Sequence, residues 1–350
     1  IGKENVCYVH VVPLLYIDVS GEFKTKAIQL STRQLREAGI QPDILVTRCS
    51  KPMPPELKPK ISMFTDVDEA NIIEAVDART IYEVPLLFQK QGLKEILENT
   101  LQLWHREANL VEWQKFVDNV VSPEKEIHTA IVGKYAELED AYMSVREALV
   151  HAGAKYATKV KRHWINAEEI ESNPGLLQSL RDKGELHGVI VPGWFGSRGI
   201  EWKIAAIKFV RENNIPFLGI CLGLQLSVVE FARNVCGVAD ATSTEFEKPG
   251  TPFIDYLPDQ NETIAKGGTL RLGHQDAVIQ EGSLIHKLYG STTINDRHRH
   301  RYEVCQDKHE ILRSNGLVLS GTSHEGRLVE YIENPHPLFD GLVKASIDSL

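Results

Sequence analysis

Short apolar runs alternate with amphipathic stretches along most of this 350-residue chain. Buried strands are expected at residues 42–48, 128–133, 160–165, 187–193 and 215–220. Helical spacing is found at residues 29–38, 140–152, 176–182, 201–213 and 224–235. This alternation predicts parallel sheets with helices on both faces, so the expected fold class is α/β. Reactive groups should then gather at the carboxyl ends of the strands.

The strand–helix series is interrupted once, between residues 100 and 126. This stretch is polar, and Ser122-Pro123 breaks any helix there. We predict a first domain at residues 1–108, a linker at residues 109–125 and a second domain at residues 126–350, a length that suits two ordinary domains. Because the chain starts at Ile1, inside a strand-like run, we expect it to be a fragment or a processed chain.

Composition and cysteine usage exclude several classes of protein. The formal charge is −9, which argues against a nucleic-acid-binding surface. Five scattered cysteines with no CxxC pair argue against a disulfide framework or a structural metal site, and favour a reducing compartment. No apolar run is long enough to span a membrane, and no signal-peptide pattern is present. The sequence therefore predicts a cytoplasmic protein with no membrane, nucleic-acid or metal partner.

The segment around Cys221 carries the strongest functional signal. Gly219 and Gly223 flank Ile220-Cys221-Leu222 at the junction between a predicted strand and a predicted helix. A Gly-x-nucleophile-x-Gly turn lifts a side chain clear of the sheet. The helix N-terminus should lower the pKa of the thiol, and the N–H of Leu222 should stabilise an oxyanion. The alternative is a buried structural cysteine, which the flanking glycines disfavour.

Residues 219–225 resemble the nucleophile motif of class I glutamine amidotransferases. Other segments narrow this resemblance to the CTP synthase family: residues 20–26, 39–43, 60–64, 132–135, 140–142, 191–199, 243–246, 267–273 and 297–304. The resemblance implies the C-terminal part of a P-loop-type amidoligase (synthetase) domain, then a flavodoxin-like glutaminase domain. It further implies a carbon–nitrogen ligase of pyrimidine nucleotide biosynthesis, which hydrolyses glutamine and uses the ammonia to convert UTP to CTP with ATP.

Roles in glutamine hydrolysis follow from this resemblance. Cys221 is the nucleophile that forms a glutamyl thioester, and Leu222 and Gly193 contribute to the oxyanion site. Gln225, Glu245 and Arg301 match positions that hold glutamine. A carboxylate can pair with the α-ammonium and a guanidinium can bind the α-carboxylate as a fork. Without the motifs, Glu245 or Arg301 would be read as a solvated surface charge.

Nucleotide-binding residues are implied in the first domain. Lys24, Lys26, Gln29 and Lys60 match the UTP site of the family, where CTP also binds as an inhibitor. Two lysines beside a glycine turn can grip a triphosphate, although such a pair is more often a solvated face. The basic, histidine-rich run at residues 297–301 supports a metal or nucleic-acid patch only weakly, and the resemblance assigns it to glutamine binding and interdomain packing.

The sequence departs from the family at the glutaminase site. Residues 328–334 run directly into residues 335–341, so the His-Pro-Glu motif that activates the nucleophile is absent. His324 and His336 are the nearest substitutes, and neither lies at the position of the motif. Trp194 replaces the second glycine of a Pro-Gly-Gly loop, where an indole would crowd the pocket. We therefore expect a degenerate glutaminase site.

The first domain also departs from the family. Ala27-Ile28 replaces Pro-Thr, which puts an apolar side chain where a hydroxyl is expected beside UTP. The glycine-rich phosphate loop of the family is not in this sequence. ATP and Mg²⁺ are therefore expected for the full-length enzyme and are not expected to be held by this chain alone.

Two hypotheses remain open. The first is a CTP synthase with glutamine, UTP and CTP as ligands, GTP as an activator and a homotetramer or filament as its assembly. The second is a catalytically inactive paralogue or fragment that acts as an assembly partner of an active synthase. A triad hydrolase of another kind is disfavoured by the first hundred residues.

Overall fold

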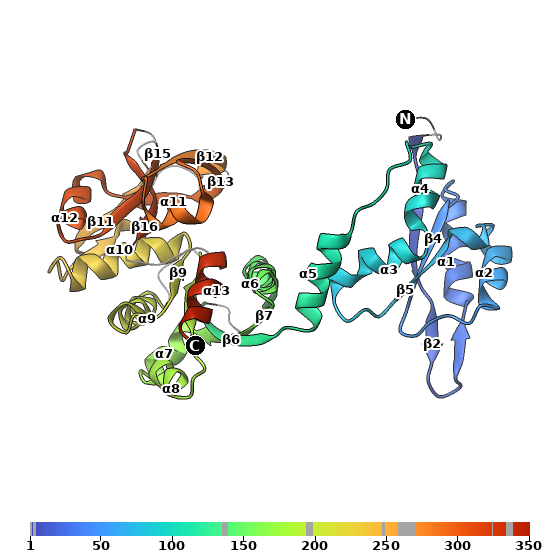
Figure 1. Ribbon diagram of the computed structural model, residues 1–350, viewed down its shortest axis with the longest axis horizontal. Helices are drawn as coiled ribbons and strands as arrows, with labels where there is room; N and C mark the ends of the chain where they lie inside the picture. The colour runs from blue at the N-terminus through green and yellow to red at the C-terminus, as the bar shows by residue number, and fades with distance from the viewer. Residues whose placement is uncertain are drawn as a thin grey trace. The chain divides into compact units, whose positions relative to one another are not determined.

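The computed structural model describes residue 2 and residues 5–134, 139–193, 199–246, 249–257, 271–323, 325–333 and 339–350. The chain divides into two compact units, Ile1–Ser122 and Pro123–Leu350, each of which is described by itself (Figure 1). No helix in the described part of the chain is both long and apolar enough to cross a membrane.

The first unit is built on a three-stranded parallel sheet in the order β1-β4-β5. Its strands are β1 (Val9–Pro13), β4 (Ile44–Cys49) and β5 (Ile72–Val76), and a short hairpin follows β1, formed by β2 (Leu15–Ile17) and β3 (Glu22–Lys24). The helices are α1 (Lys26–Glu37), α2 (Leu57–Thr65), α3 (Val84–Lys90), α4 (Leu93–Leu101) and α5 (Val111–Val121), with short 3₁₀ turns at Glu69–Asn71 and Ile81–Glu83. One apolar cluster contains Ile28 and Ile61, and another joins the opposite face of β4 to α3 and α4.

Helix α5 occupies the stretch that was predicted to be a linker. Trp113 donates its indole N–H to the carbonyl of Tyr82 at 2.8 Å, and the rings of Tyr82 and Phe116 meet edge to face at 5.0 Å. These aromatic contacts hold the helix against the first unit. The prediction of a linker over residues 109–125 therefore missed an ordered helix, which lies before the boundary at Ser122.

The second unit contains a four-stranded parallel sheet in the order β7-β6-β8-β9. Its strands are β6 (Lys125–Gly133), β7 (Thr158–Asn166), β8 (Gly188–Val191) and β9 (Phe217–Gly219). Helices α6 (Met143–Lys155) and α13 (Phe339–Asp348) pack on one face. The other face carries α7 (Ala167–Ser172), α8 (Leu176–Asp182), α9 (Ile200–Glu212) and α10 (Leu222–Asn234). This strand order is the flavodoxin-like order, and the predicted α/β class is confirmed.

A mainly antiparallel region follows α10, although its strands β10 and β11 pair in parallel, and the sequence patterns did not predict this region. It comprises β10 (Ala241–Ser243), β11 (Thr251–Tyr256), β12 (Arg271–Ile279), β13 (Thr293–His300), β14 (Tyr302–Val304), β15 (Val318–Ser323) and β16 (Leu328–Glu333). The short helices α11 (Leu284–Tyr289) and α12 (His309–Ser314) lie between strands, and 3₁₀ turns occur at Glu139–Tyr142, Thr244–Phe246 and Gln306–Lys308. Figure 1 shows this region in orange and red beside α10, on which β11 and β14 pack.

Two glycines let α10 sit directly on the parallel sheet. A Cβ at Gly223 would lie 2.0 Å from the carbonyl oxygen of Val191 in β8, and a Cβ at Gly219 would lie 2.7 Å from the carbonyl of Gly223. Both distances are shorter than any van der Waals contact, so only glycine fits at either position. The Gly-x-Cys-x-Gly pattern therefore sets how closely helix and sheet approach at Cys221.

Three histidines contact one another on this parallel sheet: His128 in β6, His163 in β7 and His187, which directly precedes β8. His128 Nδ1 lies 2.9 Å from His163 Nε2, and the backbone N–H of His128 donates to His187 Nδ1 at 3.0 Å. Burial, followed by the proximity of His128, lowers the pKa of both His163 and His187. A proton added to His187 Nδ1 would remove the acceptor for the His128 N–H. The cluster is therefore compatible with neutral imidazoles and is disrupted by charged ones.

This cluster predicts loss of stability in mild acid. A depressed folded-state pKa means that the unfolded chain binds more protons, so the stabilisation is present above about pH 6.5 and is lost as the pH falls through the folded-state values. Glu126, 3.5 Å from His128 Nε2, and Glu185, which raises the pKa of His163, act against this loss, whereas burial is the largest influence on His163. We expect the unfolding free energy to fall by on the order of 1 kcal/mol between pH 7.5 and 5.5. Urea midpoints should show a smaller pH dependence for His163→Gln than for the native chain, and equal dependences would contradict the prediction.

Candidate active site

Cys221 sits at the sharp turn between β9 and α10. Its backbone has φ 54° and ψ −105°, a conformation that non-glycine residues rarely adopt. A strained backbone conformation persists only where the packing around it leaves no alternative. Such conformations are concentrated at functional sites. The strand–turn–helix context predicted for the elbow is present, and the side chain lies at the carboxyl end of the parallel sheet, as expected.

The sequence predicted that the helix N-terminus lowers the pKa of the Cys221 thiol. That prediction is wrong, because the pKa is raised. Burial raises the pKa of Cys221 to about 11, although the N–H of Leu222 acts in the opposite direction. The carboxylates of Glu245 and Glu303 raise it further. Desolvation of a thiolate therefore outweighs the helix N-terminus. At pH 7 this thiol is therefore almost entirely protonated, and nucleophilic chemistry at Cys221 would need a base.

Gly193 and Leu222 both lie against the sulfur. The N–H of Leu222 hydrogen-bonds to the thiol. A Cβ at Gly193 would lie 2.9 Å from the Cβ of Cys221 and 3.7 Å from its Sγ, so the loop after β8 passes directly beside this thiol. The two residues predicted for the oxyanion site are thus neighbours of the same atom. Trp194, predicted to crowd this pocket, lies outside the described residues.

Glu245 and Arg301, which come from different elements, both act on Tyr302. Glu245 belongs to the 3₁₀ turn Thr244–Phe246, and buried Arg301 lies between β13 and β14. The pKa of Tyr302 is raised mainly by burial, and beyond that Glu245 raises it while Arg301 lowers it, so both charges act at this phenol. Glu245 also acts on the thiol of Cys221. A carboxylate therefore acts on the Cys221 thiol, and the guanidinium of Arg301 acts on the same phenol as that carboxylate.

The side chain of Gln225, which was predicted to hold glutamine, is hydrogen-bonded to the backbone of this protein. It is buried, and its Nε2 donates to the carbonyl of Tyr302 at 3.0 Å. This bond ties the first turn of α10 to β14. The amide is thus engaged by backbone, and any contact with glutamine at this position would come from the main chain of the helix.

Lys203 is a charged residue near the site that the sequence analysis missed. It lies on α9 and is only 1% exposed. Burial, the charge of Lys134 and, in the opposite direction, the charge of Glu245 leave its pKa lowered to about 8. A signal was present in the sequence, because Lys203 lies on the same helical stripe as Ile200 and Ile207. A lysine on the apolar stripe of a helix indicates a buried cation.

A buried polar network lies across β12, β13 and β16. Arg271 Nη1 is 2.7 Å from Glu330 Oε1, 3.1 Å from His300 Nε2 and 3.5 Å from His298 Nδ1. Donor atoms of His298, His300 and Glu330 lie within 4.8 Å of one another, a spacing that a metal ion could use. The guanidinium contacts all three groups, so a divalent cation there would meet a fixed positive charge. The network is best described as a buried ion cluster.

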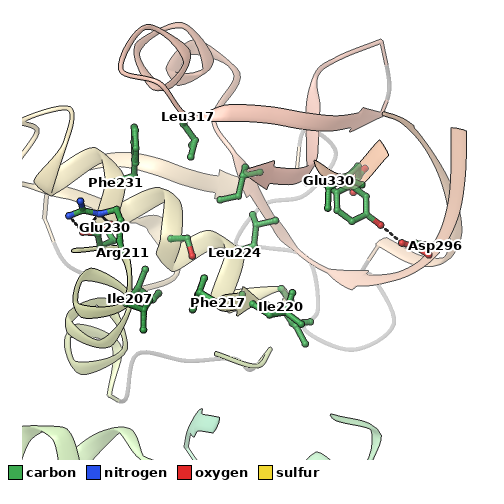
Figure 2. Close-up of a pocket in the computed structure, with 18 of the residues that line it drawn as sticks. Ile207, Arg211, Phe217, Ile220, Leu224, Glu230, Phe231, Asp296, Leu317 and Glu330 are labelled. Atoms are coloured by element: carbon green, nitrogen blue, oxygen red, sulfur yellow. Dashed lines mark hydrogen bonds and ion pairs between the residues drawn. The ribbon is translucent and has the colours of Figure 1, made fainter. Parts of the chain in front are cut away.

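A cavity of about 300 Å³ connects Cys221 to this network. Its walls come from β9, α9 and α10 on one side and from β13 and β16 on the other. Figure 2 shows Phe217 and Ile220 below, Phe231 and Leu317 above, and Glu330 and Asp296 at the far end. Cys221 and His298 both line this cavity.

The four residues predicted for nucleotide binding surround one cavity in the first unit. It has a volume of about 550 Å³ and is lined by the β2–β3 hairpin, the start of α1 and the start of α2, including Lys24, Lys26, Gln29 and Lys60. The N–H groups at the start of a helix favour anions. Glu22 pairs with Lys24 at 2.5 Å and also lines the cavity.

Ile28 does not lie beside this cavity. Its side chain is fully buried in the core with Leu45 and Ile61. The prediction that it replaces a hydroxyl next to the nucleotide is therefore wrong, because the first turn of α1 points this position toward the sheet. His324 and His336, considered as substitutes for the missing base, both lie outside the described residues.

Comparisons with known proteins agree with this architecture. Residues 1–103 match the family model "CTP synthase N-terminus", and residues 137–342 match "Glutamine amidotransferase class-I". The CTP synthase of Methanocaldococcus jannaschii is 52% identical over 99% of this chain and 69% of its own length. That of Methanococcus maripaludis is 50% identical over 99% of this chain and 70% of its own length.

A solved structure supports the assignment of the second unit. The glutaminase domain of Trypanosoma brucei CTPS with bound acivicin matches with a TM-score of 0.56 and 30% identity, over 63% of this chain and 94% of that chain. The two family models follow one another along the chain, and identity near one half extends across both units. This chain belongs to the CTP synthase family.

Proposed function

We propose that this protein acts as a glutamine-hydrolysing CTP synthase. Glutamine is hydrolysed in the second unit, and the ammonia is used by the amidoligase domain. There ATP phosphorylates the 4-oxygen of UTP, and ammonia displaces the phosphate to give CTP. The observation that carries this proposal is Cys221, held at a strained strand–helix turn with Gly193 beside it and the charge of Glu245 acting on its thiol.

Each group near Cys221 has a chemical role in hydrolysis. Glu245 pairs with the α-ammonium of glutamine, and Arg301 binds its α-carboxylate. The sulfur attacks the side-chain amide carbon, and the N–H groups of Leu222 and Gly193 stabilise the oxyanion. Ammonia leaves as the thioester forms, and water then releases glutamate and restores the thiol. Gln225 positions the first turn of α10 through its bond to Tyr302.

In the first unit, Lys24, Lys26, Gln29 and Lys60 bind the triphosphate of UTP, and CTP as its competitor. Their convergence on one cavity at the carboxyl ends of β1 and β4 supports this assignment. The reaction also requires ATP and Mg²⁺. The sequence contains no G-x-x-x-x-G-K-[ST] phosphate loop, and we assign neither ligand to residues of this chain.

We further propose that glutamine hydrolysis is impaired here. The late His-Pro-Glu motif is absent between Asn334 and Pro335. The alignment with the Methanocaldococcus jannaschii protein spans 371 positions, so at least 371 − 350 = 21 of its residues have no counterpart in this chain. A thiol pKa of about 11 agrees with a nucleophile that lacks its usual activation. A purely structural partner is not favoured, because identity is high across both units.

Family properties complete the proposal. We infer a cytoplasmic protein that assembles as a homotetramer or filament and responds to GTP. The formal charge of −9 agrees with a small-molecule enzyme that has no nucleic-acid partner.

The test of this function is ammonia release from glutamine by the purified chain. A slow release is expected, with one glutamate formed for each ammonia. Cys221→Ser should abolish it, and Cys236→Ser, a change at a half-buried cysteine outside the site, should leave it unchanged. Release that persists in Cys221→Ser would overturn the proposed function.

The nucleotide site gives a separate prediction. UTP should bind weakly to this chain, because the family site also uses other segments and subunits. Lys60→Glu should lower the affinity at least tenfold, since it replaces an attractive charge with a repulsive one. Calorimetry with UTP on native, Lys60→Glu and Lys58→Glu chains would measure this. Equal losses in the two variants would contradict a site specific to Lys60.

A further inference from the structure

His298 is held in one tautomer by its neighbours. Its Nδ1 lies 3.2 Å from Glu330 Oε2. Arg271 Nη1 is also near this nitrogen, but its two protons are used by Glu330 and His300 at 2.7 Å and 3.1 Å. The Nδ1 of His298 therefore carries the proton and donates it to Glu330. The lone pair of the neutral ring is then on Nε2.

The second nitrogen of His298 has no hydrogen-bond partner among the described residues. The atom is also buried. An unpaired polar atom in a protein interior is costly and calls for a reason. An imidazole with a carboxylate on Nδ1 and a free Nε2 is the arrangement that a catalytic triad uses to accept a proton.

Glu330 is fixed firmly enough to orient the ring. Its side chain is 2% exposed, and it accepts hydrogen bonds from Arg271 and from the hydroxyl of Ser323. These contacts come from β12 and β15, while Glu330 itself is on β16. Three strands therefore hold the carboxylate in place behind His298.

The strand that carries His298 touches the nucleophile. The carbonyl oxygen of Arg299, the next residue of β13, lies 3.8 Å from the Sγ of Cys221. His298, Glu330 and Cys221 all line the cavity of about 300 Å³. A space of that volume can hold a water molecule, which would be the route for a proton between the thiol and the imidazole.

His300 is nearby but is not available as a base. Its Nδ1 is 3.0 Å from the carbonyl of Tyr302, and its Nε2 accepts from Arg271 at 3.1 Å. Both nitrogens are thus engaged. The two histidines share a strand and a face, and they differ in whether a lone pair is free.

We propose that His298, oriented by Glu330, is the general base for Cys221 in this chain. The inference rests on the proposed glutaminase function. The proton of Sγ passes to Nε2 as sulfur bonds to the amide carbon of glutamine. The imidazolium returns that proton to the departing nitrogen, which leaves as ammonia, and the same ring then takes a proton from the water that cleaves the thioester.

The pH profile of Cys221 alkylation in the native chain tests this inference. Burial lowers the pKa of His298, which Glu330 and Asp296 raise and Arg271 lowers, and His300 lies on the same face. With His298 as base, the rate of alkylation by iodoacetamide should level off above pH 6.5, and peptide mapping by mass spectrometry can follow it. A rate that keeps rising tenfold per pH unit toward pH 11 would mean unassisted ionisation and would overturn the proposal.

Variants give a second, independent measurement. At pH 7.5, His298→Gln should slow alkylation of Cys221 by about 10²-fold, and free imidazole in the buffer should restore part of the rate. His300→Gln, the matched control, should stay within about threefold of native. Loss of rate without imidazole rescue would assign His298 a merely structural role and overturn the proposal.

Failure of the inference can be told apart from failure of the proposed function. Ammonia release that survives Cys221→Ser would overturn the function. Release that requires Cys221 but is unchanged in His298→Gln would overturn only the role of His298. Release lost in Cys221→Ser and reduced in His298→Gln, with the imidazole rescue, supports both.

Discussion

Insertion of a His-Pro-Glu segment between Asn334 and Pro335, combined with Trp194→Gly, should raise ammonia release from glutamine by about 10²–10⁴-fold. The thiol of Cys221 has a pKa of about 11, so almost none of it is ionised at neutral pH. A base and its orienting carboxylate supply the missing activation.

The insertion and Trp194→Gly, each made alone, separate the contribution of the base from that of the oxyanion loop. Trp194→Gly alone should give little gain, because an open pocket does not ionise the thiol. The insertion alone should be limited by the loop at Gly193-Trp194, since loss of one oxyanion donor commonly costs about 10²–10³-fold. These effects act on one reaction and need not multiply.

Two outcomes are informative for the repair experiment. A native chain that turns over as fast as the double repair would show that the absence of the motif has no catalytic consequence. If instead the native rate is low and falls further in His298→Gln, the residual activity comes from the base within the antiparallel region.

Selective labelling of Cys221 by a diazo-ketone analogue of glutamine is the second large expected effect. Acidity cannot produce this selectivity, because burial raises the pKa of Cys49 to about 11 and that of Cys305 to about 12. Recognition of the α-ammonium and α-carboxylate by Glu245 and Arg301 must place the electrophile at Cys221. Peptide mapping after partial reaction should find essentially all label on this residue.

Controls for labelling follow from the same argument. Arg301→Met should remove the preference for Cys221, while iodoacetamide, which offers neither charged group, should react with less preference in the native chain. Label distributed equally over Cys49, Cys236 and Cys305 would show that Cys221 is not the glutamine nucleophile.

Local pattern was a good guide where a residue's role depends on its neighbours in sequence. Most of the parallel strands and helices between residues 128 and 235 were predicted because apolar periodicity reports which face of an element is buried. The antiparallel region was not predicted, because its strands β12 and β13 alternate charged and polar residues, such as those at residues 295–300, on a partly exposed sheet. Such strands lack the apolar signal that identifies a buried one.

The sequence by itself determined the α/β class and the elbow at Cys221, since glycine spacing and helix periodicity are local properties of the chain, and its motifs identified the family by resemblance. Only the tertiary structure decided the electrostatics. Burial reversed the expected pKa shift of Cys221, placed Ile28 in the core and left Lys203 as a buried cation. It also joined His298 to Glu330 across strands 32 positions apart in sequence, with one ring nitrogen unpaired. Desolvation and through-space charge depend on which distant segments meet, and a single sequence does not record those contacts.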